Sequence, residues 1–241
     1  MTTINVNTIA PSGSTLTVGE SGDTIVAVDE IKVNTVKDAG GNTLWVSNGS
    51  GTLSSVSSGF GGALNLLSTQ TASGSSAITF TSGIDSTYKE YIWKFININP
   101  ATNATTFGFQ VNASGETGYN ETITSTYFRA YHQENDGGAD GPGFQASPSQ
   151  DQGTALQNLI YSIGNASDEA GCGELHLFNP SSTTYAKNFY TVSNAYTTNG
   201  NDMSYQVFAA GYVNTTTAIT QIEFKMTSGN FDGKIKMYGV S

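Results

Sequence analysis

Apolar and polar residues alternate with a period of two along most of the chain from residue 63 onward. Such alternation, bounded by Gly, Pro, Asn and Asp, is typical of strands that bury one face. The strongest expected strand is residues 91–98, which are dense in aromatic and β-branched side chains and are followed closely by Pro100. The other expected strands are residues 78–80, 107–111, 122–131, 174–178, 187–193, 204–213, 219–227 and 234–240.

About nine strands at short spacing predict an all-β domain. Residues 154–164 fit a short helix or a strand, and residues 134–153 are rich in breakers and are expected to form a loop. We expect a β-sandwich, most simply a jelly roll, over residues 63–241. A segment of that length can bury a core without disulfides.

The first 62 residues show shorter alternating runs, including residues 16–18, 25–28 and 31–34, each closed by a turn-forming sequence. This pattern predicts short strands and tight turns. The segment has too few large apolar side chains to offset the entropy lost when it orders alone. It is therefore either disordered or shares apolar surface with neighbouring copies or a larger assembly, and the regular runs favour sharing.

The composition of residues 47–62, SNGSGTLSSVSSGFGG, is almost entirely small and polar, which is typical of a flexible linker. The chain is therefore expected to have three parts. Residues 1–46 form a short-strand segment for attachment and oligomerisation, residues 47–62 form the linker, and residues 63–241 form the β-sandwich domain.

Composition and charge exclude several classes of function. Charged residues make up 12% of the chain, and 9 basic against 19 acidic residues give a net charge of −10. Without a basic surface, nucleic acid is not an expected partner. Arg129 is the only arginine, so planar recognition of anions is expected to be nearly absent. Cys172 is the only cysteine, which excludes an intrachain disulfide.

Neither membrane insertion nor classical secretion is expected from the sequence. No run of 18 apolar residues is present, so no membrane-spanning helix is expected. The first residues have no basic flank and no apolar block, so we expect no secretion signal.

Catalytic chemistry is poorly indicated, and we predict a protein that is not an enzyme and holds no cofactor or metal. His132 and His176 lie in different expected strands, and no Gly-x-Ser-x-Gly turn precedes a helix. Acidic pairs for glycoside cleavage are drawn from breaker-rich stretches, where carboxylates normally serve turns and solubility. The candidates are Glu116, Glu121, Glu134, Asp136, Asp140, Asp151, Asp168, Glu169 and Glu174.

Calcium is a milder alternative for the glycine-rich loop between Glu134 and Asp140. Glu134, Asn135, Asp136 and Asp140 supply hard oxygen ligands there. Their spacing does not match the twelve-residue EF-hand rule, so a plain solvent loop is favoured over a metal site.

Tyrosines provide the most suggestive functional signal. Several lie in or near expected strands that are rich in Asn, Gln and Thr: Tyr127, Tyr131, Tyr185, Tyr190, Tyr196, Tyr205 and Tyr212. Exposed tyrosines beside amides and hydroxyls suit contacts with sugars, and we select Tyr127, Tyr131, Tyr185 and Tyr196 as candidate glycan contacts. The alternative is that these tyrosines lie half-buried at the edges of the sandwich with a solvated hydroxyl.

Two patches of sequence resemble structural segments of tail fibres and other appendage proteins of marine bacteriophages. The first is Leu16–Ile25 followed by Ile31–Asn42. The second combines Leu66–Ser73 and Ile78–Tyr88 with the ending Ile235–Val240, and it is similar to the globular modules of those proteins.

The resemblance implies a virion structural protein, usually homotrimeric, with an N-terminal attachment part and a distal β-domain. Its expected partners are its own copies, other virion proteins through residues 1–46, and host surface polysaccharide. The chain of 241 residues is short for a tail fibre, so a capsid fibre or decoration protein is equally admissible. A non-viral carbohydrate-binding module or adhesin is the alternative from another class, and a depolymerase comes third.

Overall fold

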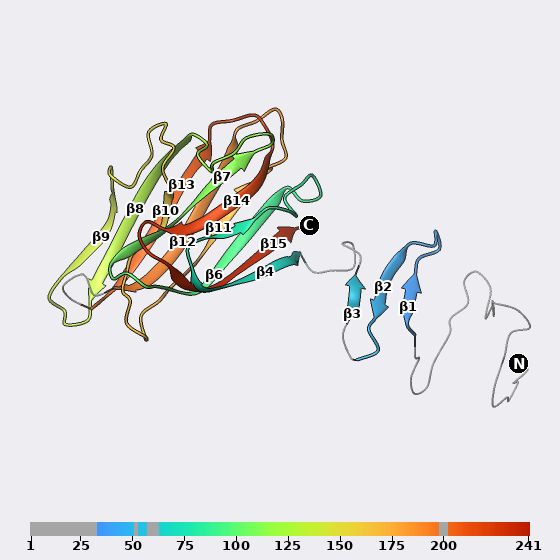
Figure 1. Cartoon of the computed structure of the whole chain (residues 1–241), viewed down its shortest axis with the longest axis horizontal. Coiled ribbons are helices and arrows are strands. Elements are labelled where there is room, and N and C mark those ends of the chain that lie inside the picture. Colours follow the sequence, from blue (N-terminus) through green and yellow to red (C-terminus); the bar gives the residue numbers. More distant parts are fainter. Residues whose placement is uncertain (1–32, 51–52, 57–62, 198–201) are drawn as a thin grey trace, which may run out of the picture. The chain divides into compact units, whose positions relative to one another are not determined.

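The computed structural model describes residues 33–50, 53–56, 63–197 and 202–241 (Figure 1). The chain divides into two compact units, residues 1–57 and residues 58–241. Within the described ranges the elements are strands and turns, and none is a helix able to cross a membrane. The runs predicted at 16–18 and 25–28, and with them most of the attachment segment 1–46, lie outside the described residues.

The first unit contains a three-stranded antiparallel sheet in the order β1-β2-β3. Its strands are β1 (Thr35–Lys37), β2 (Thr43–Ser47) and β3 (Leu53–Val56). Asp38 organises the β1–β2 turn, because its carboxylate accepts hydrogen bonds from the backbone and side-chain amides of Asn42. The third strand lies inside residues 47–62, the span for which composition predicts a linker, and it pairs Val56 with Trp45.

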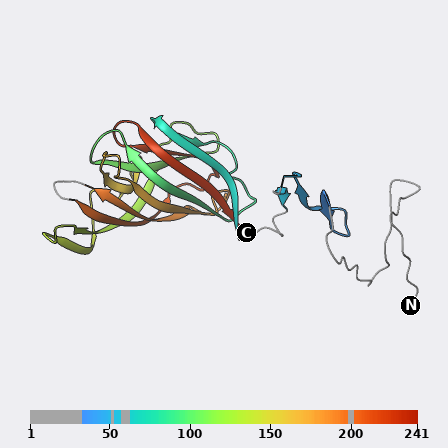
Figure 2. The same ribbon diagram turned by 90° about the horizontal axis from the view of Figure 1, so that it is seen from below.

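The second unit is built around an eight-stranded antiparallel sheet (Figures 1 and 2). The first and last strands of the unit are neighbours at one end of this sheet, which brings both ends of the domain together. In spatial order the strands are β4 (Leu64–Ser75), β15 (Phe231–Val240), β6 (Glu90–Pro100), β11 (Gly171–Phe178), β12 (Lys187–Thr197), β13 (Met203–Val213), β8 (Ile123–Gln133) and β9 (Ala139–Phe144).

A four-stranded antiparallel sheet packs against one face of the larger sheet. In spatial order its strands are β10 (Gln157–Ile163), β7 (Thr105–Ala113), β14 (Ile219–Met226) and β5 (Ile78–Phe80). All nine residues of β7 are buried, as expected for a central strand of the smaller sheet.

Aromatic side chains from both sheets fill the core between them. Phe224 of the smaller sheet lies 6.1 Å from Trp93 and 5.2 Å from Phe95 of the larger sheet, measured between ring centroids. Phe109 meets Phe189 in the same way at 5.2 Å. The Phe95–Phe224 and Phe109–Phe189 pairs are edge-to-face, and such pairs add to the stabilisation that burial alone provides. The all-β sandwich predicted from the alternation is confirmed.

The expected strands from residue 78 onward all correspond to observed strands, and residues 154–164 contain the strand β10 rather than a helix. In the second unit, two observed strands were not expected, β4 and β9. The sequence of β9, ADGPGF, is full of breakers, but β9 is an edge strand, where Pro and Gly are tolerated because one side needs no ladder partner. The β4 sequence is largely polar and is also at a sheet edge.

Candidate functional site

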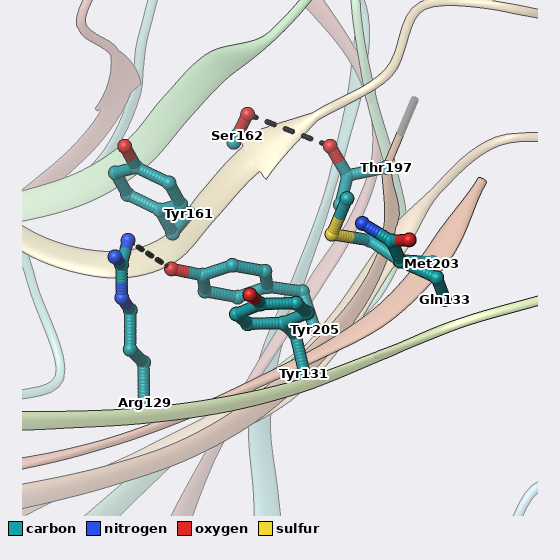
Figure 3. Close-up of a pocket in the computed structure, with 8 residues that line it drawn as sticks. All are labelled: Arg129, Tyr131, Gln133, Tyr161, Ser162, Thr197, Met203 and Tyr205. Atoms are coloured by element: carbon teal, nitrogen blue, oxygen red, sulfur yellow. Dashed lines mark hydrogen bonds between the residues drawn. The ribbon is translucent and has the colours of Figure 1, made fainter. Parts of the chain in front are cut away.

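A cleft opens where the larger sheet extends past the smaller one. The smaller sheet ends at β10, which packs across β12 and β13, whereas the larger sheet continues through β8 and β9. The inner face of this extension carries a second buried cluster, separate from the main core and containing Tyr127 and Tyr205. The cleft beside it has a volume of about 230 Å³ and is lined by Arg129, Tyr131, Gln133, Tyr161, Ser162, Thr197, Met203 and Tyr205 (Figure 3).

Strand alternation places most of these side chains in the cleft. Successive side chains of a strand point to opposite faces, so Arg129, Tyr131 and Gln133 of β8 share the inner face. Tyr205 of β13 is the direct neighbour of Tyr131 in the ladder, and the two therefore lie on the same face.

A backbone irregularity in β10 supplies the opposite wall. The register of β10 shifts between Ile160 and Ile163, and Ser162 has a φ angle of 52°, which is uncommon for a residue other than glycine. Because of this bulge, the consecutive residues Tyr161 and Ser162 both line the cleft, which a regular strand does not allow. The Thr197 hydroxyl lies 3.4 Å from the Ser162 hydroxyl across the cleft floor.

Three tyrosine rings form a stack inside the cleft. Tyr205 lies between Tyr131, at 6.1 Å and an interplanar angle of 9°, and Tyr161, at 5.1 Å and 27°. Tyr205 is buried, whereas Tyr131 and Tyr161 at the two ends are half-buried. The stack therefore holds flat aromatic surface at the cleft next to amide and hydroxyl groups.

The single arginine of the chain lies against this stack. The Arg129 guanidinium carbon is 5.7 Å from the ring centroid of Tyr161 and 5.6 Å from that of Tyr205, which are cation–π distances. Its Nη1 donates a hydrogen bond to the Tyr205 hydroxyl (Figure 3). Burial raises the pKa of Tyr205 to about 12 although Arg129 acts to lower it, so the phenol stays neutral at ordinary pH.

Two buried polar atoms at the cleft have no hydrogen-bond partner among the described residues. They are the Tyr127 hydroxyl and the Arg129 Nε. All the described residues together contain four such side-chain atoms. Native proteins leave few buried polar groups unsatisfied, and those that remain call for an explanation such as a ligand or water. Burial raises the pKa of Tyr127, with smaller contributions from Tyr205 and Tyr161.

The structure brings only two of the four tyrosines predicted as glycan contacts together. Tyr131 lines the cleft, and Tyr127 lies on the same face of β8 but is completely buried, so its ring is not exposed as the prediction assumed. Tyr185 is 68% exposed in the connection between β11 and β12, whereas the cleft lies near the opposite end of β12. Tyr196 is half-buried on the other face of β12 from the cleft residue Thr197.

Sequence analysis missed two residues that define the cleft, Arg129 and Tyr161. Arg129 enters the sequence prediction only as the single arginine of the chain, although its period-two spacing with Tyr131 and Gln133 already places all three on one strand face. Tyr161 lies in the segment that was ambiguous between helix and strand, so its neighbours were not predictable. Tyr205 was among the seven tyrosines of interest but not among the four selected.

Neither histidine lines the cleft, and the two lie on different strands, His132 on β8 and His176 on β11. His176 is buried on the outer face of β11, with Nδ1 2.5 Å from Glu90 Oε1 and Nε2 3.2 Å from Glu174 Oε1. Its ring stacks on Tyr190 at 4.3 Å. The exposed His132 lies 3.4 Å from Asp136 in the turn between β8 and β9. Neither contact set includes a serine or cysteine nucleophile.

Two of the acidic residues considered for catalysis accept hydrogen bonds from backbone N–H groups. Glu121 Oε1 accepts the Ala113 N–H at 2.9 Å, and Glu169 Oε2 accepts the Ala166 N–H at 2.7 Å. In the ranges that the structure describes, no three His, Cys, Asp or Glu side chains gather as a metal site, and this includes the Glu134–Asp140 loop considered for calcium.

Comparison of the chain with protein-family models, curated proteins and solved structures finds no match. The functional interpretation therefore depends on the cleft itself and on the features of the sequence.

Proposed function

We propose that this chain is a bacteriophage virion structural protein, a tail- or capsid-fibre-like appendage, whose β-sandwich adheres to saccharide on the host surface. The proposal assigns attachment and homotrimer formation to residues 1–46 and ligand contact to the cleft between β8, β13 and β10. It assigns no catalytic step to the protein.

The observation that carries the proposal is the tyrosine stack beside fixed polar groups. Sugars present apolar C–H faces and a rim of hydroxyls, and they are bound by aromatic surface next to hydrogen-bonding side chains. The cleft offers both, because Tyr131 and Tyr161 end the stack beside the Gln133 amide and the Ser162 hydroxyl. A cleft of about 230 Å³ has room for one sugar residue of a chain rather than for a large ligand.

The adhesion part is tested by binding the full chain to surface polysaccharide purified from candidate host bacteria. Tyr131→Ala, which removes an accessible ring of the cleft, should weaken binding by roughly 5- to 30-fold, because stacking and burial of one aromatic ring contribute roughly 1–2 kcal/mol. Tyr185→Ala is the matched control, since it removes an exposed tyrosine near the opposite end of β12. Equal losses for both variants, or none for either, would exclude the cleft as the contact.

The assembly part is tested by light scattering. Three copies of the 25.3 kDa chain give 3 × 25.3, about 76 kDa, at micromolar concentration. A mass near 25 kDa would contradict a trimeric appendage. Antibody labelling of virions in the electron microscope then separates a tail from a capsid location, and absence from virions would favour a non-viral carbohydrate-binding module.

A further inference from the structure

The charge of Arg129 has no acidic partner in the described part of the chain. The ion pairs there join lysines and histidines to carboxylates, and none includes Arg129. Burial acts to lower the pKa of the guanidinium, and the phenols of Tyr205 and Tyr161 act to raise it. A half-buried cation that is held by neutral rings and lines an open cleft is an incomplete ion pair, and an anionic ligand completes it.

The size of the charge narrows the class of ligand. One guanidinium matches one negative charge, whereas phosphate chains are normally bound by several cations, and the chain as a whole carries −10. A planar guanidinium fits a planar carboxylate through two parallel N–H···O bonds. The rings of Tyr131 and Tyr161 and the hydroxyl groups beside the guanidinium fit a sugar ring. The complementary ligand is therefore a sugar that carries a carboxylate.

We propose that the cleft is specific for acidic saccharides, with Arg129 binding the carboxylate of a uronate residue and Tyr131 supporting its ring. This inference rests on the proposed saccharide-binding function and names its ligand class. The Arg129 Nε and the Tyr127 hydroxyl are both buried and have no hydrogen-bond partner among the described residues, so the polar groups next to the site are incompletely satisfied by the protein itself.

One acidic residue lies beside the site and provides an internal test. Asp140 of β9 is the direct ladder partner of Tyr131, so its exposed side chain lies on the same face of the sheet. A carboxylate there repels an anionic ligand, and its effect on a neutral sugar is small. Asp140→Asn should therefore strengthen binding of an acidic saccharide while leaving the ring stack and Arg129 in place.

The experiment is calorimetric titration of the full chain with short oligosaccharides of glucuronate and of galacturonate, each beside its carboxyl-reduced, uncharged counterpart. The parent protein should prefer at least one acidic oligosaccharide over its neutral form by about tenfold or more, as expected for hydrogen bonds to a charged group. Arg129→Gln should abolish that preference. Lys89→Gln removes the same charge at an exposed position on the chain and should retain it.

The possible outcomes distinguish the uronate assignment from the proposed saccharide adhesion. Equal binding of acidic and neutral forms overturns the uronate assignment but leaves saccharide adhesion standing. Absence of binding to every oligosaccharide overturns the proposed adhesion as well. If Arg129→Gln fails to fold, Asp140→Asn decides: a roughly two- to fivefold gain for the acidic form alone supports the assignment, and no gain, or an equal gain for the neutral form, overturns it.

Discussion

The orphan hydroxyl of Tyr127 makes an unusual prediction about stability. The ring is fully buried on the inner face of β8, and its hydroxyl has no hydrogen-bond partner among the described residues. In most buried tyrosines, removal of the hydroxyl destabilises the protein, because a hydrogen bond is lost. Here Tyr127→Phe removes an unsatisfied polar group instead, so the variant should be more stable than the parent.

The magnitude follows from the cost of burying a polar group without a partner. That cost is about 1–3 kcal/mol, and the lost packing of one oxygen atom offsets part of it, so we expect a gain of roughly 1 kcal/mol. Tyr91→Phe is the matched control, because Tyr91 is equally buried but its hydroxyl accepts the Asp85 N–H at 3.0 Å and contacts the Asp85 carbonyl at 3.1 Å. It should lose about 1 kcal/mol.

The assay is urea unfolding of the full chains at one fixed protein concentration, because assembly makes apparent stability depend on concentration. A gain of 1 kcal/mol raises the midpoint by roughly 0.5 M urea at unchanged slope. The pH dependence gives a second readout. Burial raises the pKa of Tyr127 above its ordinary 10.0, so the folded state holds this proton more tightly than the unfolded chain.

The stability linked to that proton is therefore complete below pH 10 and is lost as the pH rises above 10 toward the raised pKa of the folded state. Phenylalanine does not titrate, so the advantage of Tyr127→Phe should grow by up to about 1.4 kcal/mol between pH 10 and 11. A variant that is less stable than the parent at pH 7 would refute the reasoning, because it would mean that the hydroxyl is satisfied in the folded protein.

Three further predictions concern packing and charge. Gly211→Ala should destabilise by about 1–3 kcal/mol in the same assay, because its Cβ would lie 2.3 Å from the Thr124 carbonyl oxygen, whereas Gly141→Ala, with nothing within 4 Å, should be nearly neutral. Phe224→Ala should cost about 3–5 kcal/mol and Phe208→Ala, 44% exposed, under about 1 kcal/mol. The affinity for acidic oligosaccharides should stay constant or rise when the salt concentration is raised from about 10 to 150 mM. The net charge of −10 on the protein repels an anionic ligand, and salt weakens this long-range repulsion because the screening length falls from about 30 to 8 Å. A steep loss of affinity with salt would contradict this prediction.

The sandwich was predictable because its signal is local. Strand alternation within residues 204–213 is imposed by a core on one side and solvent on the other, so the period-two pattern there records burial directly. Edge strands do not need this alternation. The β9 segment needs no apolar face and pairs on one side only, so its Gly and Pro residues read as a loop although the backbone is extended.

The cleft was only partly predictable because it depends on long-range geometry. Tyr131 and Tyr205 are 74 positions apart, and their stacking follows from the β8–β13 register, which the sequence does not specify. The Tyr161 wall depends on a bulge at Ser162 that no Gly or Pro marks. Tyr185 and Tyr196 have the same amide-rich context as Tyr131, so composition alone does not separate cleft from surface.

The presence of a single arginine predicts that planar recognition of anions is nearly absent, but the position of Arg129 in the cleft favours the opposite interpretation. In a chain with few charges, a single guanidinium without a carboxylate partner among the described residues is not neutralised locally, and this is the basis on which we propose that it sets the charge preference of the cleft. One such contact gives weak binding to a monosaccharide. A homotrimer presenting three clefts to a polymer with repeated uronates would convert weak contacts into firm adhesion, because each later contact is intramolecular. The affinity for long acidic polymers should therefore exceed the affinity for short ones by far more than the ratio of their uronate counts. An affinity that rises only in proportion to that count would mean that the clefts bind independently and that trimer formation does not contribute to adhesion.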